Sequence, residues 1–395
     1  MQKSVLVAGA GIGGLCAAVA LARRGISVEV LEQTSVLAEV GAGVQMSPNA
    51  VKVLANLGLD KRVEAVAFEP DGGEMRHYKS GKTISYTPFK NACERRYGAK
   101  YYHVHRADLH KVLYDAALEL GVSVRLDTKI ASYDQSGGTV RAVSTDGRSF
   151  QGDVLVGADG IHSAVRAQML GPDEAEFTGQ IAWRAVIPVE NLPPNLIRPN
   201  ATVWIGPGRH VVTYYVRGGT LVNLAAFQDK DHWPSESWRA KGDINEFRNA
   251  FKGWHTEVGT LVEAASDCFV WALYAREPLS TWSEGHVTLL GDACHPMLPY
   301  MSQGAAMAIE DSYVLADRLS RKGMTIAQAL MDYERCRKPR TSMVQAGSRK
   351  NGKLFHMSGG LRSWGRLTAL RIAATLQGGT AHSRVDPLYE YDAAR

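Results

Sequence analysis

A glycine-rich turn close to the N-terminus is the feature that most limits what this chain can fold into. Residues 9–14 read Gly-Ala-Gly-Ile-Gly-Gly, between an apolar run at 4–8 and small, apolar residues with helical spacing at 15–24. A second apolar run at 26–31 completes a strand–helix–strand pattern. Glycines in such a turn let the backbone close on a pyrophosphate at the helix N-terminus. The pattern therefore predicts a βαβ nucleotide-binding unit.

Glycines alone do not make this turn specific, because the chain contains 39 glycines in 395 residues. At that frequency a G-x-G-x-x-G pattern arises by chance roughly 0.4 times per chain, and an ordinary tight turn would look the same. Glu32 supplies the context, because it follows the second predicted strand, where a carboxylate accepts hydrogen bonds from an adenosine ribose. We therefore expect an ADP-containing cofactor, either NAD or FAD. The residues expected to bind it are Gly9, Gly11, Gly14 and Glu32.

Composition limits the class of protein. The chain is 45% apolar and 22% charged, which is enough for a large core and two structural units. The net charge of +5 includes no basic run, so we expect no nucleic-acid partner. Five cysteines form no C-x-x-C pair, which argues against disulfides and a metal site and favours a reducing cytoplasm. Glycines interrupt the apolar N-terminus and no apolar run reaches about eighteen residues, so we expect neither an export signal nor membrane insertion.

The middle of the chain has a different pattern of predicted secondary structure from its two ends. Short alternating strands are predicted between 181 and 275, whereas helices and buried parallel strands are predicted on either side, the last helices at 304–319 and 325–344. This pattern indicates an antiparallel sheet inserted into the nucleotide-binding unit. The expected division is a discontinuous cofactor-binding domain at 1–75, 100–176 and 276–345, a substrate domain at 76–99 and 177–275, and a C-terminal helical segment and tail at 346–395.

Two later segments carry a resemblance to a known family. Segment 153–166 contains Asp159-Gly160, and segment 289–296 contains Gly291-Asp292. Both resemble motifs of the single-component flavoprotein aromatic hydroxylases, the family of the salicylate, 3-hydroxybenzoate and 6-hydroxynicotinate hydroxylases. The likeness extends over nearly the whole chain, in the family's order and spacing. Three motifs together are far more specific than any one of them.

The resemblance implies both a fold and a chemistry. The implied fold class is α/β: a Rossmann-like FAD-binding domain of the GR2 type, with a PHBH-like (p-hydroxybenzoate hydroxylase-like) fold, an inserted antiparallel β-sheet substrate domain and C-terminal helices. The implied activity is that of a monooxygenase that binds FAD, uses O2, and takes NADH or NADPH as a transient co-substrate. No second G-x-G-x-x-G motif provides a separate nicotinamide domain. A monomer or a homodimer is expected.

The same likeness assigns residues to FAD. Asp292 would bind the ribitol, Asp159 would lie beside the pyrophosphate, and Arg106 would contact the flavin side. A carboxylate after a buried strand needs hydrogen-bond donors, which ribitol hydroxyls supply, although Asp292 could instead cap the following helix. The other implied cofactor residues lie in a close-approach loop and at a helix start whose amides favour an anionic reduced flavin. They are Gly43, Val44, Gly304 and Ala305.

Substrate chemistry is expected in the inserted sheet. The family's flavin C4a-hydroperoxide is electrophilic, so the aromatic ring must give up its phenolic proton to an acceptor on the protein. Period-two alternation places His210 and Tyr214 on one face of a predicted strand, roughly 13 Å apart at 3.3 Å per residue. We hypothesise that His210 takes or relays the phenolic proton and that Tyr214 donates to the carboxylate, an arrangement that resembles the 3-hydroxybenzoate hydroxylases. The alternative is that His210 is a structural histidine.

Three loop residues are expected to face the substrate: Gln45, Pro299 and Tyr300. Pro299 stands where the 3-hydroxybenzoate enzymes tend to carry glutamine, and Gln45 stands where the hydroxynicotinate enzymes carry histidine. These departures favour salicylate as substrate, converted to catechol with loss of CO2, and residues 386–392 resemble the ending of that subgroup. Hydroxylation of 3-hydroxybenzoate at position 6 and of 6-hydroxynicotinate at position 3 are the alternatives.

Functions outside this family are also considered. Residues 183–188 nearly match the W-x-W-x-I-P segment of the flavin-dependent halogenases, but Ala185 breaks the match, and a strand that ends at Pro188 is a simpler explanation. A dehydrogenase that uses NAD alone has no role for segment 289–296. A flavin-holding regulator that senses NADH without turnover is the alternative of another class.

Overall fold

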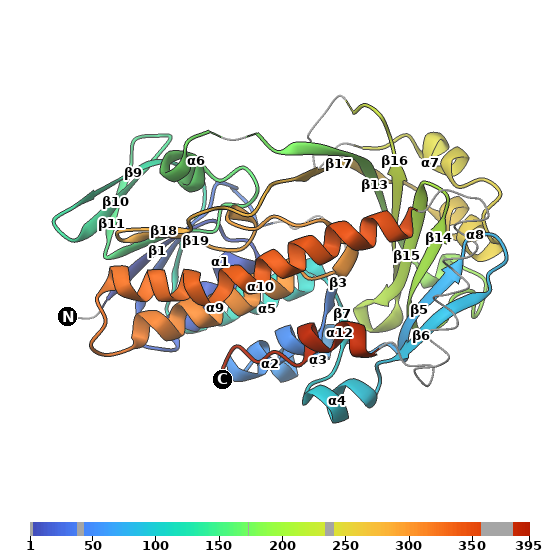
Figure 1. The fold of residues 1–395 in the computed structure, drawn as a ribbon, viewed down its shortest axis with the longest axis horizontal. Helices are drawn as coiled ribbons and strands as arrows, with labels where there is room; N and C mark the ends of the chain where they lie inside the picture. The colour runs from blue at the N-terminus through green and yellow to red at the C-terminus, as the bar shows by residue number, and fades with distance from the viewer. Residues whose placement is uncertain (1–2, 38–42, 173, 234–240, 357–381) are drawn as a thin grey trace.

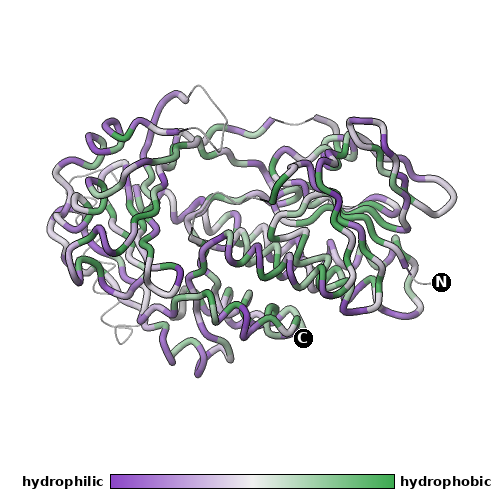
Figure 2. Tube along the Cα trace, turned by 180° about the vertical axis from the view of Figure 1, so that it is seen from behind, coloured by the Kyte–Doolittle hydropathy of each residue, from purple (hydrophilic) through white to green (hydrophobic). Residues whose placement is uncertain are grey.

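A parallel sheet is built around the glycine turn. In the computed structural model, which describes residues 3–37, 43–172, 174–233, 241–356 and 382–395, six strands follow the order β18-β19-β12-β1-β2-β8 (Figure 1). The parallel strands are β1 (Ser4–Ala8), β2 (Ser27–Leu31), β8 (Ser123–Arg125), β12 (Val154–Gly157) and β19 (Val287–Leu289), and β18 (Ser283–Glu284) is antiparallel at the edge. The central strands β1, β12 and β19 are almost entirely buried, as expected within a parallel sheet, and Figure 2 shows hydrophobic segments gathered in this sheet.

Helices cover the parallel sheet. The glycine turn leads into α1 (Ile12–Ala22), which packs against α5 (Arg106–Glu119) and α9 (Gly304–Ser320), while α2 (Pro48–Asn56) also contacts α9. Shorter helices and 3₁₀ turns include α3 (Asp60–Val66), α4 (Ala92–Tyr97), α6 (Ala164–Leu170), α12 (His382–Tyr389), η1 (Val189–Asn191), η2 (Arg217–Gly219), η3 (Gly291–Ala293) and η4 (Pro299–Met301). No helix in these described ranges is both long and apolar enough to cross a lipid bilayer.

The second large sheet is formed mainly by the middle of the chain. Its seven strands follow the order β17-β13-β16-β15-β14-β5-β6, and neighbours are antiparallel except β14 and β5. They are β5 (Gly72–His77), β6 (Thr83–Pro88), β13 (Glu176–Pro188), β14 (Asn200–Gly206), β15 (Arg209–Val216), β16 (Leu221–Asp229) and β17 (Phe269–Ala275). The inserted antiparallel sheet is thus present. The expected domain boundary between 75 and 76 falls within β5, and the domain division stays a proposal.

The two faces of this sheet have different neighbours. Val211 of β15 joins an apolar cluster with Phe247 of α7 (Ile244–Ala250) and Val258 of α8 (Thr256–Ala264). Figure 1 shows these two helices on the outer side of the sheet, away from the parallel sheet. Because side chains alternate along a strand, His210 and Tyr214 face the inner side.

Two small sheets were not predicted from the sequence. One has the order β11-β10-β9, formed by Ser149–Gly152, Thr139–Ser144 and Ile130–Ser136, and the other has the order β3-β7-β4, formed by Gly43–Met46, Tyr102–His105 and Ala67–Phe68. The strands of the second sheet have only two to four residues, too few to show a periodic pattern in the sequence, so their pairing depends on tertiary contacts. The second sheet matters for the site because β3 carries Gly43 to Gln45.

The helix α10 (Ile326–Phe355) links the two large sheets, as Figure 1 shows. Thr325 caps it in a capping box with Gln328, close to the predicted start. The predicted end at 344 is wrong, since the helix continues for eleven more residues. Pro339 removes one backbone donor within it, but burial of Ser348 and Phe355 beyond this point stabilises the continuation.

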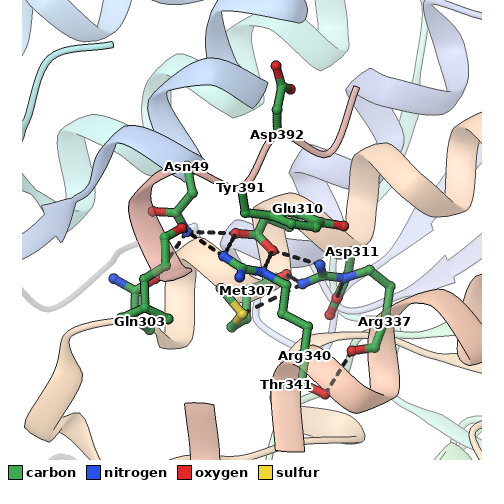
Figure 3. A network of polar contacts seen from close by, with 12 residues as sticks. Asn49, Gln303, Met307, Glu310, Asp311, Arg337, Arg340, Thr341, Tyr391 and Asp392 are labelled. Carbon is green, nitrogen blue, oxygen red and sulfur yellow. Dashed lines mark hydrogen bonds and ion pairs between the residues drawn. The ribbon is translucent and has the colours of Figure 1, made fainter. Parts of the chain in front are cut away.

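Charged residues of α9 and α10 form a largely buried cluster, of which only Arg340 is partly exposed (Figure 3). The Nε of Arg337 lies 2.7 Å from Asp311 Oδ1, and its Nη1 lies 2.7 Å from Glu310 Oε2. The Nε of Arg340 also lies 2.7 Å from Glu310 Oε2, and the Nδ2 of Asn49 donates to Glu310 Oε1 at 2.6 Å. Two guanidinium groups therefore balance two carboxylates, which offsets much of the cost of burying charge.

The C-terminal tail docks on this cluster. The guanidinium of Arg340 lies 3.9 Å from the ring centroid of Tyr391 and donates to two carbonyl oxygens of α12. Lys52 of α2 donates to the three carbonyl oxygens of 389–391. The polar tail is thus held by cations from α2 and α10.

We expect replacement of Arg337 by alanine to lower the free energy of unfolding by about 3–5 kcal/mol, because Asp311 and Glu310 would remain buried without this partner. The matched control is Arg335 on the same helix, whose side chain is 82% exposed and pairs with Asp332. Its replacement by alanine should cost no more than about 1 kcal/mol. Chemical denaturation followed by circular dichroism measures both, and equal losses would contradict the assignment.

Candidate functional site

A cavity of about 1190 Å³ lies between the two large sheets. Part of its wall follows the carboxyl ends of three parallel strands, at 11–13 after β1, at Ala158 and Gly160 after β12, and at 290–292 after β19. This edge is where open α/β sheets bind ligands. The rest of the wall includes parts of β13, β15 and β16, the start of α9 and the end of α10. The volume exceeds the range of about 300–1,000 Å³ typical of one drug-sized ligand, so a second molecule can fit beside the first.

The glycine turn has the shape needed to approach a phosphate. Gly9 has a φ of +101°, and a Cβ there would lie 2.5 Å from the carbonyl oxygen of Ala158. A Cβ on Gly14 would lie 2.0 Å from the carbonyl oxygen of Gly9, so neither position accepts a larger residue. Gly11 differs, because its Cβ would meet no described atom within 4 Å; this residue N-caps α1 and lines the cavity. Open space at a helix N-terminus suits a pyrophosphate.

Glu32 is buried behind this turn. Its Oε2 accepts a hydrogen bond from the backbone N–H of Ala10 at 2.7 Å, and its Oε1 accepts from the N–H of Thr34 at 2.9 Å. The Nε2 of His110 lies 2.7 Å from the carbonyl oxygen of Ala10 and steadies the turn from the other side. Glu32 therefore joins the end of β2 to the glycine turn. Its contact with an adenosine ribose stays a prediction.

Asp159 follows β12 and precedes α6. Its Oδ2 accepts from the backbone N–H groups of Ala164 at 2.8 Å and Val165 at 3.3 Å, which stabilises the helix N-terminus. Its Oδ1 is buried without a hydrogen-bond partner among the described residues, and burial raises the pKa of this carboxyl. The neighbouring Gly160 lines the cavity. A buried oxygen of this kind needs a donor, so it fits a hydroxyl-bearing ligand or a bound water. The place of Asp159 beside a pyrophosphate stays a prediction.

Asp292 lies in η3, directly after β19. Its carboxylate is accessible from the cavity, although protein surrounds it on the other sides. This enclosure raises the pKa of Asp292, while the charges of His295 and Arg106 act in the opposite direction. The N-cap of α9 is Gln303, which excludes the alternative in which Asp292 caps this helix. The carboxylate therefore faces the space where a cofactor's hydroxyls would lie.

Asp311 holds the loop that carries Asp292. Its Oδ2 accepts from the backbone N–H of Gly291 at 3.2 Å and lies 2.5 Å from the Nε2 of His295. Cys294, His295 and Asp311 also bring potential metal-ligand atoms within 4.8 Å of one another. Because Arg337 and His295 already pair with this carboxylate, we assign the group to structure rather than to a metal.

The residues implied for the flavin ring share one side of the cavity. They are Arg106 at the start of α5, Gly304 and Ala305 at the start of α9, and Gly43 and Val44 on β3. Residues 41 and 42 of the expected close-approach loop lie outside the described residues. A Cβ on Gly43 would lie 2.4 Å from the Cε2 of Tyr214, so the backbone passes directly against this ring. Free amides at the start of α9 give this side a positive potential.

His210, Val212 and Tyr214 line the wall formed by β15. His210 is 1% exposed and stacks on Phe227 with ring centroids 4.3 Å apart. Burial, and to a smaller extent repulsion from His356 when that imidazole is protonated, lower the pKa of His210 well below its usual value, so His210 is neutral near pH 7. Burial raises the pKa of Tyr214, so its hydroxyl keeps its proton and can donate it in a hydrogen bond.

The three expected pocket residues also line the cavity. The hydroxyl of Tyr101 donates to Gln45 Oε1 at 2.6 Å, which fixes the orientation of this amide. The hydroxyl of Tyr300 donates to Gln180 Oε1 at 2.5 Å, so Tyr300 is tied to β13. Pro299 is exposed towards the cavity at the start of η4. Their contact with a substrate stays a prediction.

Arg184 on β13 is a site residue that the sequence analysis missed. Its side chain lines the cavity, its guanidinium lies 4.4 Å from the ring centroid of Trp271, and its Nε has no hydrogen-bond partner among the described residues. Burial lowers the pKa of Arg184 to about 10. A signal was present, because Trp183 packs in the core and alternation then turns the next residue, a cation, to the inner face. An unpaired guanidinium in a cavity indicates an anionic ligand.

Comparison with known proteins identifies relatives along almost the entire chain. The family model described as FAD binding domain matches residues 2–348. The 3-amino-4-hydroxybenzoate 2-monooxygenase of Streptomyces platensis is 39% identical, over 91% of this chain and 90% of its own length. The 3-hydroxybenzoate 6-hydroxylase of Polaromonas naphthalenivorans is 37% identical over 90% and 88%, and the 6-hydroxynicotinate 3-monooxygenase of Pseudomonas fluorescens is 36% identical over 88% and 90%.

Solved structures show the same architecture. Klebsiella pneumoniae HpxO in complex with FAD and uric acid superposes with a TM-score of 0.83 at 28% identity, covering 95% of each chain. A salicylate hydroxylase in complex with its substrate superposes with a TM-score of 0.82 at 27% identity, covering 100% of this chain and 96% of its own. The similarity therefore includes both large sheets.

Replacing Asp292 by alanine is expected to weaken FAD binding about 10- to 100-fold, because a hydrogen bond to a charged acceptor contributes about 1.5–3 kcal/mol. Titration of the apoprotein with FAD, followed by quenching of flavin fluorescence, measures this loss. Asp115, which pairs with Lys111 on the exposed face of α5, provides the control variant Asp115→Ala. An Asp292→Ala protein with the affinity of the parent would remove this carboxylate from the cofactor site.

Proposed function

We propose that this chain, which belongs to the FAD-binding family of flavoprotein aromatic monooxygenases, hydroxylates a small aromatic acid that carries a phenolic hydroxyl. Membership of the family supplies the cofactors, which are FAD, NADH or NADPH, and O2. One observation carries the proposal. A neutral histidine, a tyrosine and a guanidinium without a carboxylate partner among the described residues line the same cavity as Asp292 and the start of α9.

The residues on the cofactor side fit FAD. Bound FAD supplies the redox chemistry, because its reduced ring activates O2. Asp292 accepts ribitol hydroxyls in this proposal, Gly11 leaves space for the pyrophosphate at the start of α1, and the amides of Gly304 and Ala305 favour negative charge on the neighbouring ring edge. Preorganised groups of this kind stabilise charge without having to reorient during the reaction.

The residues on the substrate side fit a phenolic acid. An electrophilic oxygen attacks an aromatic ring faster when the phenolic proton is withdrawn, so a neutral imidazole beside the hydroxyl is useful. His210 meets this need because burial keeps it unprotonated. Tyr214 donates a hydrogen bond to the carboxylate, and Arg184 supplies a positive charge that no protein carboxylate among the described residues neutralises. The phenolic end of the substrate thus meets a neutral base, and its carboxylate end meets a hydrogen-bond donor and a positive charge.

The spacing of His210 and Tyr214 favours an acid whose hydroxyl lies away from its carboxylate. Four residues along β15 span roughly 13 Å, so the two side chains address opposite ends of a small ring. The named substrates of the three relatives carry the hydroxyl meta or para to the carboxylate, whereas salicylate carries both groups on adjacent carbons. We therefore place a meta- or para-hydroxylated acid first. Salicylate, converted to catechol and CO2, is the second candidate, supported by the salicylate hydroxylase structure.

A panel of aromatic acids tests the proposal directly. We expect 3- or 4-hydroxybenzoate to accelerate NADH or NADPH oxidation by the FAD-loaded protein and to yield one hydroxylated product per reductant, with salicylate, gentisate and 6-hydroxynicotinate as comparisons. The corresponding amides lack the charge that Arg184 recognises. The concentration of each amide needed for the same acceleration should therefore be at least about tenfold higher than that of its acid. If no acid accelerates oxidation, the proposal fails and a flavin-holding regulator becomes the better explanation.

Replacing His210 by alanine should leave FAD bound but slow hydroxylation about 10²- to 10⁴-fold, the usual contribution of a general base. Flavin absorbance of the purified variant measures cofactor retention, and product analysis by chromatography measures hydroxylation. Thr220→Ala, at the exposed end of the turn that precedes β16, is the control variant. Full turnover by His210→Ala would show that this histidine is structural.

A further inference from the structure

A chain of hydrogen-bonding groups runs from His210 to the protein surface. The Nδ1 of His210 lies 2.6 Å from the Nε2 of His356, and the Nδ1 of His356 lies 2.5 Å from Asp229 Oδ1. These residues come from β15, from the C-terminal end of α10 and from the end of β16. His210 is buried in the cavity wall, whereas the side chain of Asp229 is 50% exposed. The three groups therefore connect the cavity to solvent.

Other groups pack around this chain. The aromatic neighbours of His210 are Phe227 of β16, Phe355 of α10 and Tyr300 of η4, and the polar neighbours of Asp229 are Gln180 of β13 and Arg209 of β15. Partial burial opposes ionisation of Asp229, but hydrogen bonds from His356 and Gln180 together with the charge of Arg209 hold its pKa below the usual value. Asp229 is therefore a carboxylate at neutral pH, and it can only accept hydrogen bonds.

The carboxylate fixes the proton positions along the chain. Because Asp229 only accepts, the Nδ1 of His356 carries a hydrogen, and in the neutral form of this imidazole the Nε2 carries a lone pair. The Nε2 of Gln180 lies 3.0 Å from that Nδ1, but it donates to Asp229 at 2.9 Å instead, since two donors do not bond to each other. The Nδ1 of His210 must then donate to His356. This leaves the lone pair of His210 on Nε2, the nitrogen not engaged by His356 and the one left to take a proton in the cavity.

We propose that His356 and Asp229 form a proton relay, through which His210 passes the substrate's phenolic proton from the cavity to solvent. The proposal rests on the function proposed above. The phenol O–H bond breaks as Nε2 of His210 gains the proton, the Nδ1 proton of His210 moves to Nε2 of His356, and the Nδ1 proton of His356 moves to Asp229 and then to water. No electrons are transferred, and the substrate is left as a phenolate. His356 and Asp229 act through His210, so they are positioning residues.

The relay is tested by the rate at which a bound phenol ionises. A nitro-substituted 3-hydroxybenzoate absorbs differently as phenol and phenolate, so a pH jump in a stopped-flow instrument follows its ionisation on the FAD-loaded protein without turnover. We expect His356→Gln, which keeps a polar side chain but passes no proton, to slow this ionisation about tenfold or more. Asp229→Ala should slow it in the same direction. Added imidazole should restore the rate in His356→Ala, which a loss of packing alone would not allow.

The control variant is Asp231→Ala, which removes an exposed carboxylate two residues after Asp229 and lies outside the relay. Its ionisation rate should equal that of the parent, and flavin absorbance verifies that every variant retains FAD. If His356→Gln loses FAD, the ionisation rate of Asp229→Ala tests the relay instead, because the side chain of Asp229 lies at the surface end of the relay. If the parent binds and ionises the phenol and both variants do so at the parental rate, the relay is wrong and the proposed function stands. If the parent neither binds the phenol nor responds to any aromatic acid, the proposed function fails and the relay fails with it.

Discussion

The burial of Asp311 beneath the loop that carries Asp292, here called the cofactor loop, is the interaction on which the rest of the site depends. A buried carboxylate costs several kcal/mol unless partners compensate it, and here Arg337, His295 and the N–H of Gly291 do so. Arg337 belongs to α10, whereas Gly291 and His295 belong to the loop after β19. Because Asp311 itself lies on α9, its carboxylate fixes the position of α10 and of this loop relative to α9. Because α9 also begins at the cavity wall, the orientation of Asp292 and the amides at the start of this helix are set together.

Features with a local cause could be predicted from the sequence. Gly9 lies between β1 and α1, Gly14 lies in the first turn of α1, and the structure shows that neither position has space for a side chain. Alternation along β15 correctly placed His210 and Tyr214 on one face, because a strand's side chains alternate whatever surrounds it. The family likeness located Asp292 at the cavity, and the comparisons confirm the family and its FAD.

Features that depend on contacts between distant segments could not be predicted in the same way. His356 meets His210 across 146 residues, and no periodicity relates the two. Arg184 was visible as a cation in an apolar strand, but only the fold shows that it faces a cavity and that its Nε lacks a partner among the described residues. One oxygen of Asp159 accepts hydrogen bonds at a helix N-terminus, and the other is buried without a donor in the part of the chain that the structure describes, a division that no motif reveals.

The length of α10 has a consequence for how this enzyme can change over evolution. Its thirty residues span about 45 Å, with Arg337 near the cofactor loop and the helix ending one residue before His356 at the substrate sheet. Deleting a single residue between them would rotate one end against the other by about 100° and pull it along the axis. Substrate preference can therefore change through substitutions at the cavity wall. Insertions and deletions in this helix would disrupt the cofactor site or the substrate site, so they are not tolerated.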